Sequence, residues 1–240
     1  MHLKNKIILV TGGAVRVGRA ICIELADTGA QIYCHYHQSE DQARDLKEKN
    51  PGIRLLQADL YEKGVEKKLI QAIIENAGKI DVLVNSAAIF FKTPFGNVTE
   101  EVWNKLFDLN LKAAFFLAQE AGRHMVAQGA GKIINIADTS ALKPWPSYIP
   151  YSMTKSAVIT MTKGLAKALA PLVQVNCINP GPVLLPENYS AQEKNRAIER
   201  TLLKRVGRAE DIAFAVKFLL EDGDYITGTA LAVDGGRSIQ

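Results

Sequence analysis

Short apolar runs alternate along the chain with longer segments in which apolar residues recur at helical spacing. Nearly continuous apolar runs are typical of parallel strands covered on both faces, because neither face of such a strand meets water. The pattern predicts strands at residues 6–10, 31–36, 53–57, 80–85, 132–137, 173–178 and 229–233. Helical spacing predicts helices between them, for example at residues 17–28, 42–49, 65–76, 100–128 and 152–169.

This alternation of strands and helices predicts an α/β fold. We expect a single-domain Rossmann fold over residues 1–240, with a doubly wound, seven-stranded parallel sheet and helices on both faces. Thr99 fits an N-cap, because glutamates follow it, and Pro171 fits a helix stop. The least regular stretch begins at Pro180, after the sixth strand, and reaches about Lys194. Since such sheets bind ligands at this edge, we predict a substrate loop over residues 180–205.

Composition changes this picture little. The 240 residues are 48% hydrophobic and 22% charged, which is ordinary for a globular protein. The 29 basic and 25 acidic residues leave a net charge of +4, which fits an anionic ligand or an incidental solvated surface equally well. No basic run points to nucleic acid.

The cysteines Cys22, Cys34 and Cys177 lie inside apolar segments, which favours buried thiols in a reducing compartment. No cysteine or histidine spacing resembles a zinc site, so no metal is expected. A strand-like run begins at Lys6 and leaves no room for a signal peptide before it. No apolar stretch is long enough to span a membrane. These features predict a cytoplasmic protein.

The first predicted strand leads into a glycine-rich turn, TGGAVRVG at residues 11–18, and then into a helix. Glycines let the backbone approach a pyrophosphate, and the helix N-terminus offers free N–H groups and partial positive charge. The turn therefore predicts dinucleotide binding by Gly12, Arg16, Val17 and Gly18. The cation at Arg16 favours an additional negative charge on the dinucleotide.

The end of the second strand discriminates between two dinucleotides. Folds that bind NAD usually place a carboxylate there for the ribose 2′-hydroxyl. This chain has Tyr36, His37 and Ser39 instead, which predicts a 2′-phosphate and hence NADPH rather than NADH. Asp59 and Leu60 follow the third strand, where an adenine would be bound, although an aspartate that caps a turn or helix would look the same.

Tyr151 and Lys155 open the predicted helix after the fifth strand. Their i, i+4 spacing puts both side chains on one face of the helix, at the ligand-binding edge of the sheet. An ammonium near a phenol stabilises the phenolate and lowers the phenol pKa from about 10, which makes the phenol a usable proton donor and acceptor. The pair is therefore a candidate catalytic site.

Taken together, these motifs resemble the short-chain dehydrogenase/reductase family over essentially the whole chain. The matching positions are the loop from Thr11 to Gly18, the Asn85-Ser86-Ala87-Ala88 segment, Asn110, Tyr151 with Lys155, Pro180-Gly181, and Asp234-Gly235-Gly236. The resemblance implies that Tyr151 is the proton donor and that Lys155 binds the nicotinamide ribose. It also implies that Asn110 holds a water in a proton relay, and that Asn85 and Ala87 line the adenosine ribose.

Two departures from the family pattern resemble its pteridine reductase subgroup. Arg16 stands where the family has a glycine, and Asp138 replaces the serine that usually lies thirteen residues before the tyrosine. The His37-Gln38-Ser39 segment is similar to the His-Arg-Ser cofactor segment of the subgroup, with Gln38 in place of arginine. Phe90 aligns with an aromatic residue that stacks on the pterin, and Ala88 replaces a small hydroxyl residue there.

A carboxylate at position 138 also bears on the reaction physically. It repels the alkoxide that forms from a ketone, and favours a substrate that gains a proton, such as a C=N bond. It also raises the pKa of Tyr151 and so opposes Lys155. The alternative is a loop aspartate that makes an Asx-turn with Ser140.

The leading hypothesis is an NADPH-dependent reductase of a pterin or folate, with Tyr151, Asp138, Arg16 and Phe90 at the substrate. A 3-oxoacyl thioester or other ketone reductase is the enzymatic alternative. A catalytically weakened NADPH-binding regulator is the non-enzymatic one. By family resemblance we expect a homotetramer, built on the helices at 100–128 and from Ser152. Leu109, Ala113, Phe116, Ala157 and Met161 are candidates for its interface or for packing on the sheet.

Overall fold

The computed structural model describes residues 1–185 and 189–240. Within this described part of the chain, seven parallel strands form one sheet in the order β3-β2-β1-β4-β5-β6-β7. Its strands are β1 Ile7–Val10, β2 Gln31–Tyr36, β3 Arg54–Gln57, β4 Val82–Asn85, β5 Gly131–Ile136, β6 Val173–Pro180 and β7 Ala230–Val233. The predicted doubly wound sheet is confirmed.

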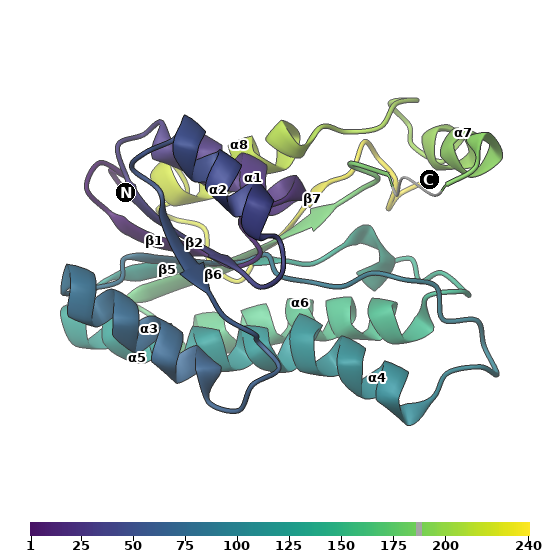
Figure 1. Ribbon diagram of the computed structural model, residues 1–240. Coiled ribbons are helices and arrows are strands. Elements are labelled where there is room, and N and C mark those ends of the chain that lie inside the picture. Colours follow the sequence, from purple (N-terminus) through teal and green to yellow (C-terminus); the bar gives the residue numbers. More distant parts are fainter. Residues whose placement is uncertain (186–188) are drawn as a thin grey trace.

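Helices cover both faces of this sheet (Figure 1). On one face lie α1 (Arg16–Ala26), α2 (Glu40–Lys49) and α8 (Ala209–Glu221), and on the other lie α3 (Val65–Ala77), α4 (Glu100–Phe107), α5 (Ala114–Gln128) and α6 (Ile149–Leu169). Each face has its own core cluster of buried aliphatic side chains. Because both faces of the sheet are buried, the strands read as continuous apolar runs in the sequence.

The strand order reverses between β1 and β4. From β1 the chain winds outward through β2 to β3 and then returns to pair β4 against the other side of β1. A crevice opens at such a switch point, outside the carboxyl ends of the strands, because the flanking connections leave in opposite directions. The loops after β1 and β4 therefore face each other across the predicted ligand site.

The helix predicted at residues 100–128 is not α-helical throughout. A π-helical segment, Asp108–Ala113, separates α4 from α5. Thr99 caps α4 as predicted, since its hydroxyl accepts a hydrogen bond from the Val102 N–H at 3.3 Å. As predicted, α6 ends at Leu169, before Pro171.

The stretch after β6 holds a helix that the sequence interpretation missed, α7 (Ala191–Glu199). Its signal is a capping box: Ser190 accepts from the Glu193 N–H, and the Glu193 carboxylate accepts from the Ser190 N–H. The predicted substrate loop, residues 180–205, thus contains a helix. Residues 186–188 of that loop lie outside the described residues.

The C-terminal segment, residues 234–240, lies against the end of α7 (Figure 1). The Leu202 N–H donates to the Gly235 carbonyl at 2.8 Å, and the Arg237 guanidinium donates to the Arg200 carbonyl at 3.3 Å. The Gln240 amide donates to the Glu199 carbonyl at 3.2 Å. These bonds join two segments that are about forty residues apart into one structural unit.

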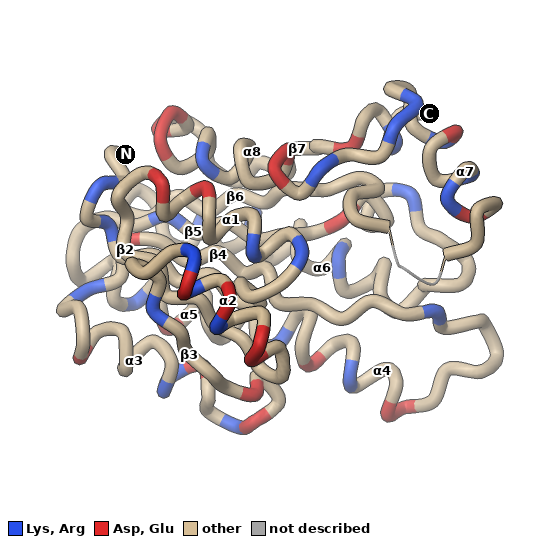
Figure 2. Tube along the Cα trace, turned by 45° about the horizontal axis from the view of Figure 1, so that its top comes forward, with Lys and Arg blue, Asp and Glu red and all other residues tan. Residues whose placement is uncertain are grey.

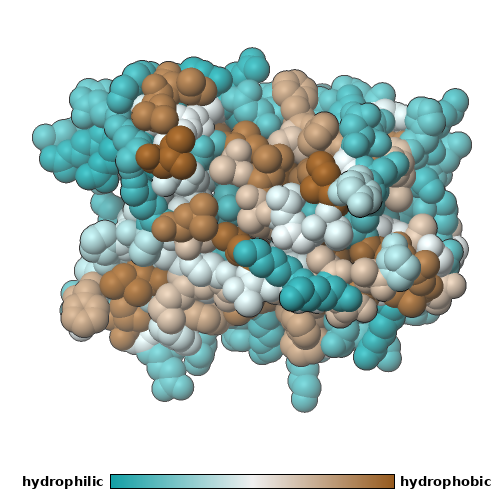
Figure 3. All heavy atoms as spheres, turned by 180° about the vertical axis from the view of Figure 1, so that it is seen from behind, coloured by the Kyte–Doolittle hydropathy of each residue, from teal (hydrophilic) through white to brown (hydrophobic). Residues whose placement is uncertain are grey.

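Apolar side chains form several separate patches on the face that is turned away in Figure 1 (Figure 3). Of the helical residues considered for self-association, Ala113 is buried in the core, whereas Phe116 is 40% exposed beside the exposed Phe115. Leu109 and Met161 pack against core clusters. Self-association through these helical residues stays a prediction.

Within residues 1–185 and 189–240, no helix combines the length and the apolarity that crossing a membrane requires.

Candidate active site

A cavity of about 600 Å³ opens at the carboxyl edge of the sheet. The loops after β1, β4 and β5 line it together with the start of α6, the stretch after β6, α7 and the C-terminal segment. Many of the predicted site residues line this cavity: Gly12, Arg16, Val17, Gly18, Ala87, Phe90, Asp138, Tyr151, Lys155, Pro180 and Gly181. Its lining does not include Tyr36, His37, Ser39, Asp59, Leu60, Asn85 or Asn110.

Close backbone packing explains the glycines of the loop after β1. Gly12 has a φ of +63°, and a Cβ there would lie 2.9 Å from the Ala87 Cα. A Cβ on Gly18 would lie 2.2 Å from the Gly12 carbonyl oxygen. No side chain fits at either position without moving the loop. The first turn of α1 therefore sits directly on the loop, with its N-terminus at the crevice, as a dinucleotide pyrophosphate requires.

Two side chains that sequence reasoning left unassigned hold this loop in place. The Thr11 hydroxyl accepts hydrogen bonds from the N–H groups of Ser86 and Ala87, both at 3.0 Å, and so ties the β1 loop to the β4 loop. Nδ1 of the buried His35 accepts from the Gly12 N–H at 3.2 Å, and its Nε2 lies 3.1 Å from the Ala58 carbonyl. Burial lowers the pKa of His35 to about 4, so the ring is neutral and Nε2 donates to Ala58.

Arg16 opens α1 with a φ of +51° and an exposed side chain. Its guanidinium donates to the carbonyl oxygen of Leu184, in the stretch after β6. The side chain therefore bridges the phosphate loop and the substrate side of the cavity, which fits the predicted contact with both cofactor and substrate.

At the predicted adenosine end, Asp59 serves as a turn cap. Its carboxylate accepts from the Tyr61 N–H at 3.0 Å and lies 3.6 Å from Nε2 of His37. Leu60 and Tyr36 are buried, whereas His37 is exposed. This bond fits the turn-cap alternative for Asp59, and the adenine contact of Asp59 and Leu60 stays a prediction. The Asp59 carboxylate also places negative charge beside His37, one of the predicted partners of a 2′-phosphate.

The structure shows how the side chains of two predicted site asparagines are held. Asn85 is not part of the cavity lining, and its amide donates to the Ala114 carbonyl and to Asn135 within the core, so its place beside the adenosine ribose stays a prediction. Asn110, in the π-helical segment, holds the main chain of Ile89 with bonds of 2.9 and 3.0 Å. A buried amide that is bonded in this way positions the adjoining Phe90 loop, and the proposed water relay at Asn110 stays a prediction. Both asparagines belong to motifs, which name a residue but not the direction of its side chain.

Tyr151, Asp138 and Lys155 are together in the structure, as the spacing of Tyr151 and Lys155 and the family resemblance at Asp138 predicted. The Tyr151 hydroxyl donates to one oxygen of Asp138 at 3.2 Å, while the other oxygen accepts from the Ser140 N–H at 2.6 Å. The Asx-turn and the contact with tyrosine therefore coexist on one carboxylate. Nζ of the buried Lys155 donates to the Ile136 carbonyl at 2.8 Å and lies 5.8 Å from the centre of the Tyr151 ring.

These contacts overturn the expectation that Lys155 lowers the phenol pKa. Burial raises the pKa of Tyr151 well above 10, and the charge and hydrogen bond of Asp138 raise it further. Burial lowers the pKa of Lys155 to about 8, because the ammonium is far from water. Burial also raises the pKa of Asp138, opposed by its bonds from Ser140 and by Lys155. Tyr151 is therefore held protonated at neutral pH.

Phe90 lies beside the catalytic tyrosine within an aromatic cluster. Its ring stacks on Tyr148 with centroids 4.5 Å apart and planes within 1°, and it meets Tyr151 edge-on at 4.9 Å. Trp145 closes a third side at 6.2 Å. Phe90 is 37% exposed, so part of its ring remains open to a flat ligand.

Sequence reasoning missed Trp145 and Tyr148, which line the cavity from the loop before α6. It also missed the contacts that bring α7 to the cavity: Lys92 pairs with Glu193 at 2.8 Å, and the hydroxyls of Tyr148 and Tyr189 lie 3.3 Å apart. The signal for Tyr148 was its i, i−3 spacing from Tyr151. Lys92 and Glu193 carried no signal, because about one hundred residues separate them.

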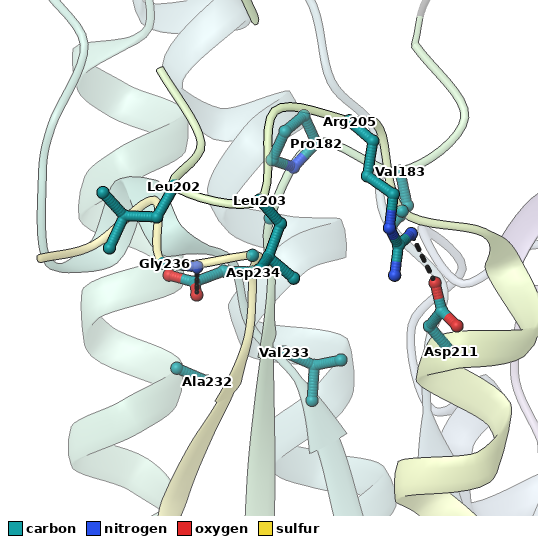
Figure 4. A pocket seen from close by; sticks show the side chains of 13 residues that line it. Pro182, Val183, Leu202, Leu203, Arg205, Asp211, Ala232, Val233, Asp234 and Gly236 are labelled. Atoms are coloured by element: carbon teal, nitrogen blue, oxygen red, sulfur yellow. Dashed lines mark hydrogen bonds and ion pairs between the residues drawn. The ribbon is translucent and has the colours of Figure 1, made fainter. Parts of the chain in front are cut away.

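A second cavity, of about 520 Å³, adjoins the first where β6 and β7 end (Figure 4). Arg205 lies 3.5 Å from Asp211 across one side, and Leu202 and Leu203 close the other (Figure 4). Gly181 belongs to both linings, and a Cβ there would lie 2.5 Å from the Asp234 Cα. This close approach to the end of β7 explains the glycine after Pro180.

Comparisons with known proteins agree with this geometry. A family model described as enoyl-(acyl carrier protein) reductase matches residues 13–238. A short-chain type dehydrogenase/reductase of Picea abies is 31% identical, over 98% of this chain and 93% of that protein. The 3-oxoacyl-[acyl-carrier-protein] reductase FabG of Staphylococcus epidermidis is 33% identical, over 97% of this chain and 98% of that protein. The crystal structure of FolM alternative dihydrofolate reductase 1 from Brucella suis in complex with NADP superposes with a TM-score of 0.92, at 30% identity over 99% and 97% of the two chains.

A dinucleotide crevice beside a buried tyrosine and lysine defines an oxidoreductase that works with a nicotinamide cofactor. The sequence matches extend over nearly the whole length of this chain and of its relatives. The chain belongs to the short-chain dehydrogenase/reductase family, and it is an NAD(P)-dependent oxidoreductase.

Proposed function

We propose that this protein is an NADPH-dependent reductase of a pterin or folate, in which a ring C=N bond is reduced. The observation that carries the proposal is the hydrogen bond from Tyr151 to Asp138, at the position where a ketone reductase of this family has a serine. The FolM similarity supports the same substrate class at 30% identity.

The residues of the cavity fit a bound dinucleotide. Gly12 and Gly18 bring the loop backbone and the α1 N-terminus to the crevice, and Lys155 stands at its other end. Arg16 adds a guanidinium to this loop, and no carboxylate ends β2, which favours the phosphorylated cofactor. When it is bound, NADPH supplies the hydride.

The protein's own groups supply the proton. Tyr151 is protonated at neutral pH and donates to the ring nitrogen next to the carbon that is reduced. Asp138 accepts from Tyr151 at rest, and after the transfer the phenolate regains its proton from water in the open cavity, with the Asp138 carboxylate, whose pKa is raised, as a relay. Its oxygens also retain lone pairs for a ring N–H or amino group of the substrate. Phe90 offers its open face to the flat ring.

The similarity to FabG favours a second candidate, reduction of a 3-oxoacyl thioester. That reaction places negative charge on the carbonyl oxygen, beside Tyr151. The Asp138 carboxylate lies 3.2 Å from the same hydroxyl and would oppose that charge. The geometry therefore ranks the thioester below the pterin.

The deciding experiment follows NADPH oxidation with dihydrobiopterin, dihydromonapterin, dihydrofolate and acetoacetyl thioester, with Tyr151→Phe as the blank. We expect turnover that depends on Tyr151 with at least one pterin. Turnover of the thioester alone would overturn the proposal. NADPH binding without any turnover would favour the weakened regulator.

The substitution Asp138→Ser separates the two enzymatic candidates. Because it removes the carboxylate and restores the usual family residue, we expect slower pterin reduction and faster reduction of the thioester. Asp138→Asn is the matched control, since it keeps the size of the side chain but lacks the charge. Unchanged thioester turnover in both variants would refute the charge argument.

A further inference from the structure

Three arginines that the catalytic chemistry does not use line the outer part of the active-site cavity. Arg196 and Arg200 come from α7 and its C-cap, and Arg237 comes from the C-terminal segment. All three line the cavity that holds Tyr151 and Asp138. Figure 2 shows basic residues on both α7 and the C-terminal segment, which lie side by side.

The fold brings these three arginines to neighbouring positions. Arg196 and Arg200 are four residues apart, and the Arg200 N–H donates to the Arg196 carbonyl, so both occupy one face of the last helical turn. Arg237 is fixed beside them, since its guanidinium donates to the Arg200 carbonyl at 3.3 Å. A helix C-terminus favours cations and accounts for two of the three, but not for Arg237 from a separate segment.

The carboxylates of the site do not neutralise this group. Glu193 is paired with Lys92 at 2.8 Å, and Asp138 is engaged by Tyr151 and Ser140. Across residues 1–185 and 189–240, no carboxylate forms an ion pair with any of the three arginines. Partial burial and the charge of Arg200 lower the pKa of Arg237, opposed by Asp138 and Asp234. Arg196 and Arg200 are exposed and Arg237 is partly buried, and three like charges at one rim of the cavity repel one another unless an anion joins them.

We propose that Arg196, Arg200 and Arg237 bind an anionic tail of the substrate, carboxylate or phosphate, while its ring occupies the Phe90 and Tyr151 end of the cavity. The inference rests on the proposed pterin or folate reductase function and names the kind of pterin preferred. Guanidinium groups match both carboxylate and phosphate, because each presents a fork of donors to two oxygens.

The test compares substrates that share one ring and differ in the tail: dihydrofolate with a glutamate tail, dihydroneopterin phosphate, and the uncharged dihydrobiopterin. For each we measure kcat/KM in the unsubstituted protein and in Arg196→Gln, Arg200→Gln and Arg237→Gln. The readout is the ratio of kcat/KM for the charged substrate to that for dihydrobiopterin. Arg123→Gln is the matched control, since Arg123 is an exposed arginine of α5 outside the cavity.

We expect each of the three variants to lower this ratio about tenfold, the loss typical of one charge-assisted hydrogen bond. Added salt lowers the ratio in the unsubstituted protein, because it screens the tail contact. A drop for dihydrofolate alone assigns the site to carboxylates, and a drop for the phosphate alone assigns it to phosphates. A ratio that none of the three variants lowers, or that Arg123→Gln lowers equally, overturns the inference although pterin turnover persists. Absence of turnover with all three substrates is instead the failure of the proposed function.

Discussion

The two halves of the active-site cavity are built in different ways. At the cofactor half, backbone packs on backbone: Gly12 lies against Ala87, Gly18 against Gly12, and the Thr11 hydroxyl ties two loops together. At the substrate half, side chains from separate segments meet, as in the pairs Phe90–Tyr148 and Lys92–Glu193. The cofactor half is fixed because there is no space for side chains between its backbone segments. The substrate half is fixed by contacts between side chains, which substitutions can replace. A single substitution should therefore damage the cofactor half through strain and the substrate half through lost contacts.

Among substitutions that test the separation of the two halves, Tyr151→Phe is expected to have the largest effect. Loss of the proton donor should lower kcat by roughly 10²–10⁴-fold, the usual contribution of a positioned general acid. Cofactor affinity should stay nearly unchanged, since the loop after β1 does not depend on the phenol. Steady-state kinetics and a fluorescence titration with NADPH measure the two. A large loss of NADPH affinity would contradict the separation of the halves.

The pH dependence of stability probes His35 in the cofactor half. The unfolded chain binds a proton at His35 below about pH 6.5, whereas the folded chain binds it only near pH 4, so stability falls as the pH falls through this window. The His35 side chain is only 2% exposed, so between pH 7 and pH 5 it should lower the free energy of unfolding by about 2 kcal/mol. Urea denaturation at both pH values measures it. His35→Gln should remove this part of the pH dependence of the unfolding free energy. An equal pH dependence in that variant would show that His35 is not its source.

The substitution Gly12→Ala tests steric exclusion at the cofactor loop. The φ of Gly12 is +63°, and the added Cβ would lie 2.9 Å from the Ala87 Cα. Together these should cost about 1–2 kcal/mol or more, seen as lower stability and weaker NADPH binding. Gly164→Ala is the matched control, because a Cβ there meets nothing within 4 Å in α6. That control should be neutral or slightly stabilising. Equal behaviour of the two variants would refute the role of close packing.

The smallest effect is expected at the substrate half for Tyr148→Leu. Loss of the ring stacked on Phe90 should raise the KM for the pterin about threefold to tenfold, the range for an aromatic pair. Trp103→Leu is the control, because it removes the stacked pair with Phe107 on α4, away from the cavity. If both variants raise KM alike, the effect is general destabilisation and not a contact with the substrate side.

The comparison also shows what a sequence can reveal. The seven strands and the glycine turn were predictable, because burial on both faces and close backbone approach restrict residue type directly. Asp138, Tyr151 and Lys155 were found by their spacing. The directions of the Asn85 and Asn110 side chains were not predictable, because a polar residue at the end of a strand or inside a helix can face either the core or the ligand. The contacts of α7 with Lys92 and with the C-terminal segment join residues far apart in the sequence, where no local pattern records them.

The mutual hydrogen bonding of α7 and the C-terminal segment has a consequence for engineering. Leu202 bonds to Gly235, Arg237 to Arg200, and Gln240 to Glu199, so each segment helps to hold the other in place. A chimaera that receives only the α7 region of a relative would leave these donors and acceptors mismatched. The transplantable unit is the pair, residues 189–205 with residues 234–240, exchanged together onto an unchanged cofactor half.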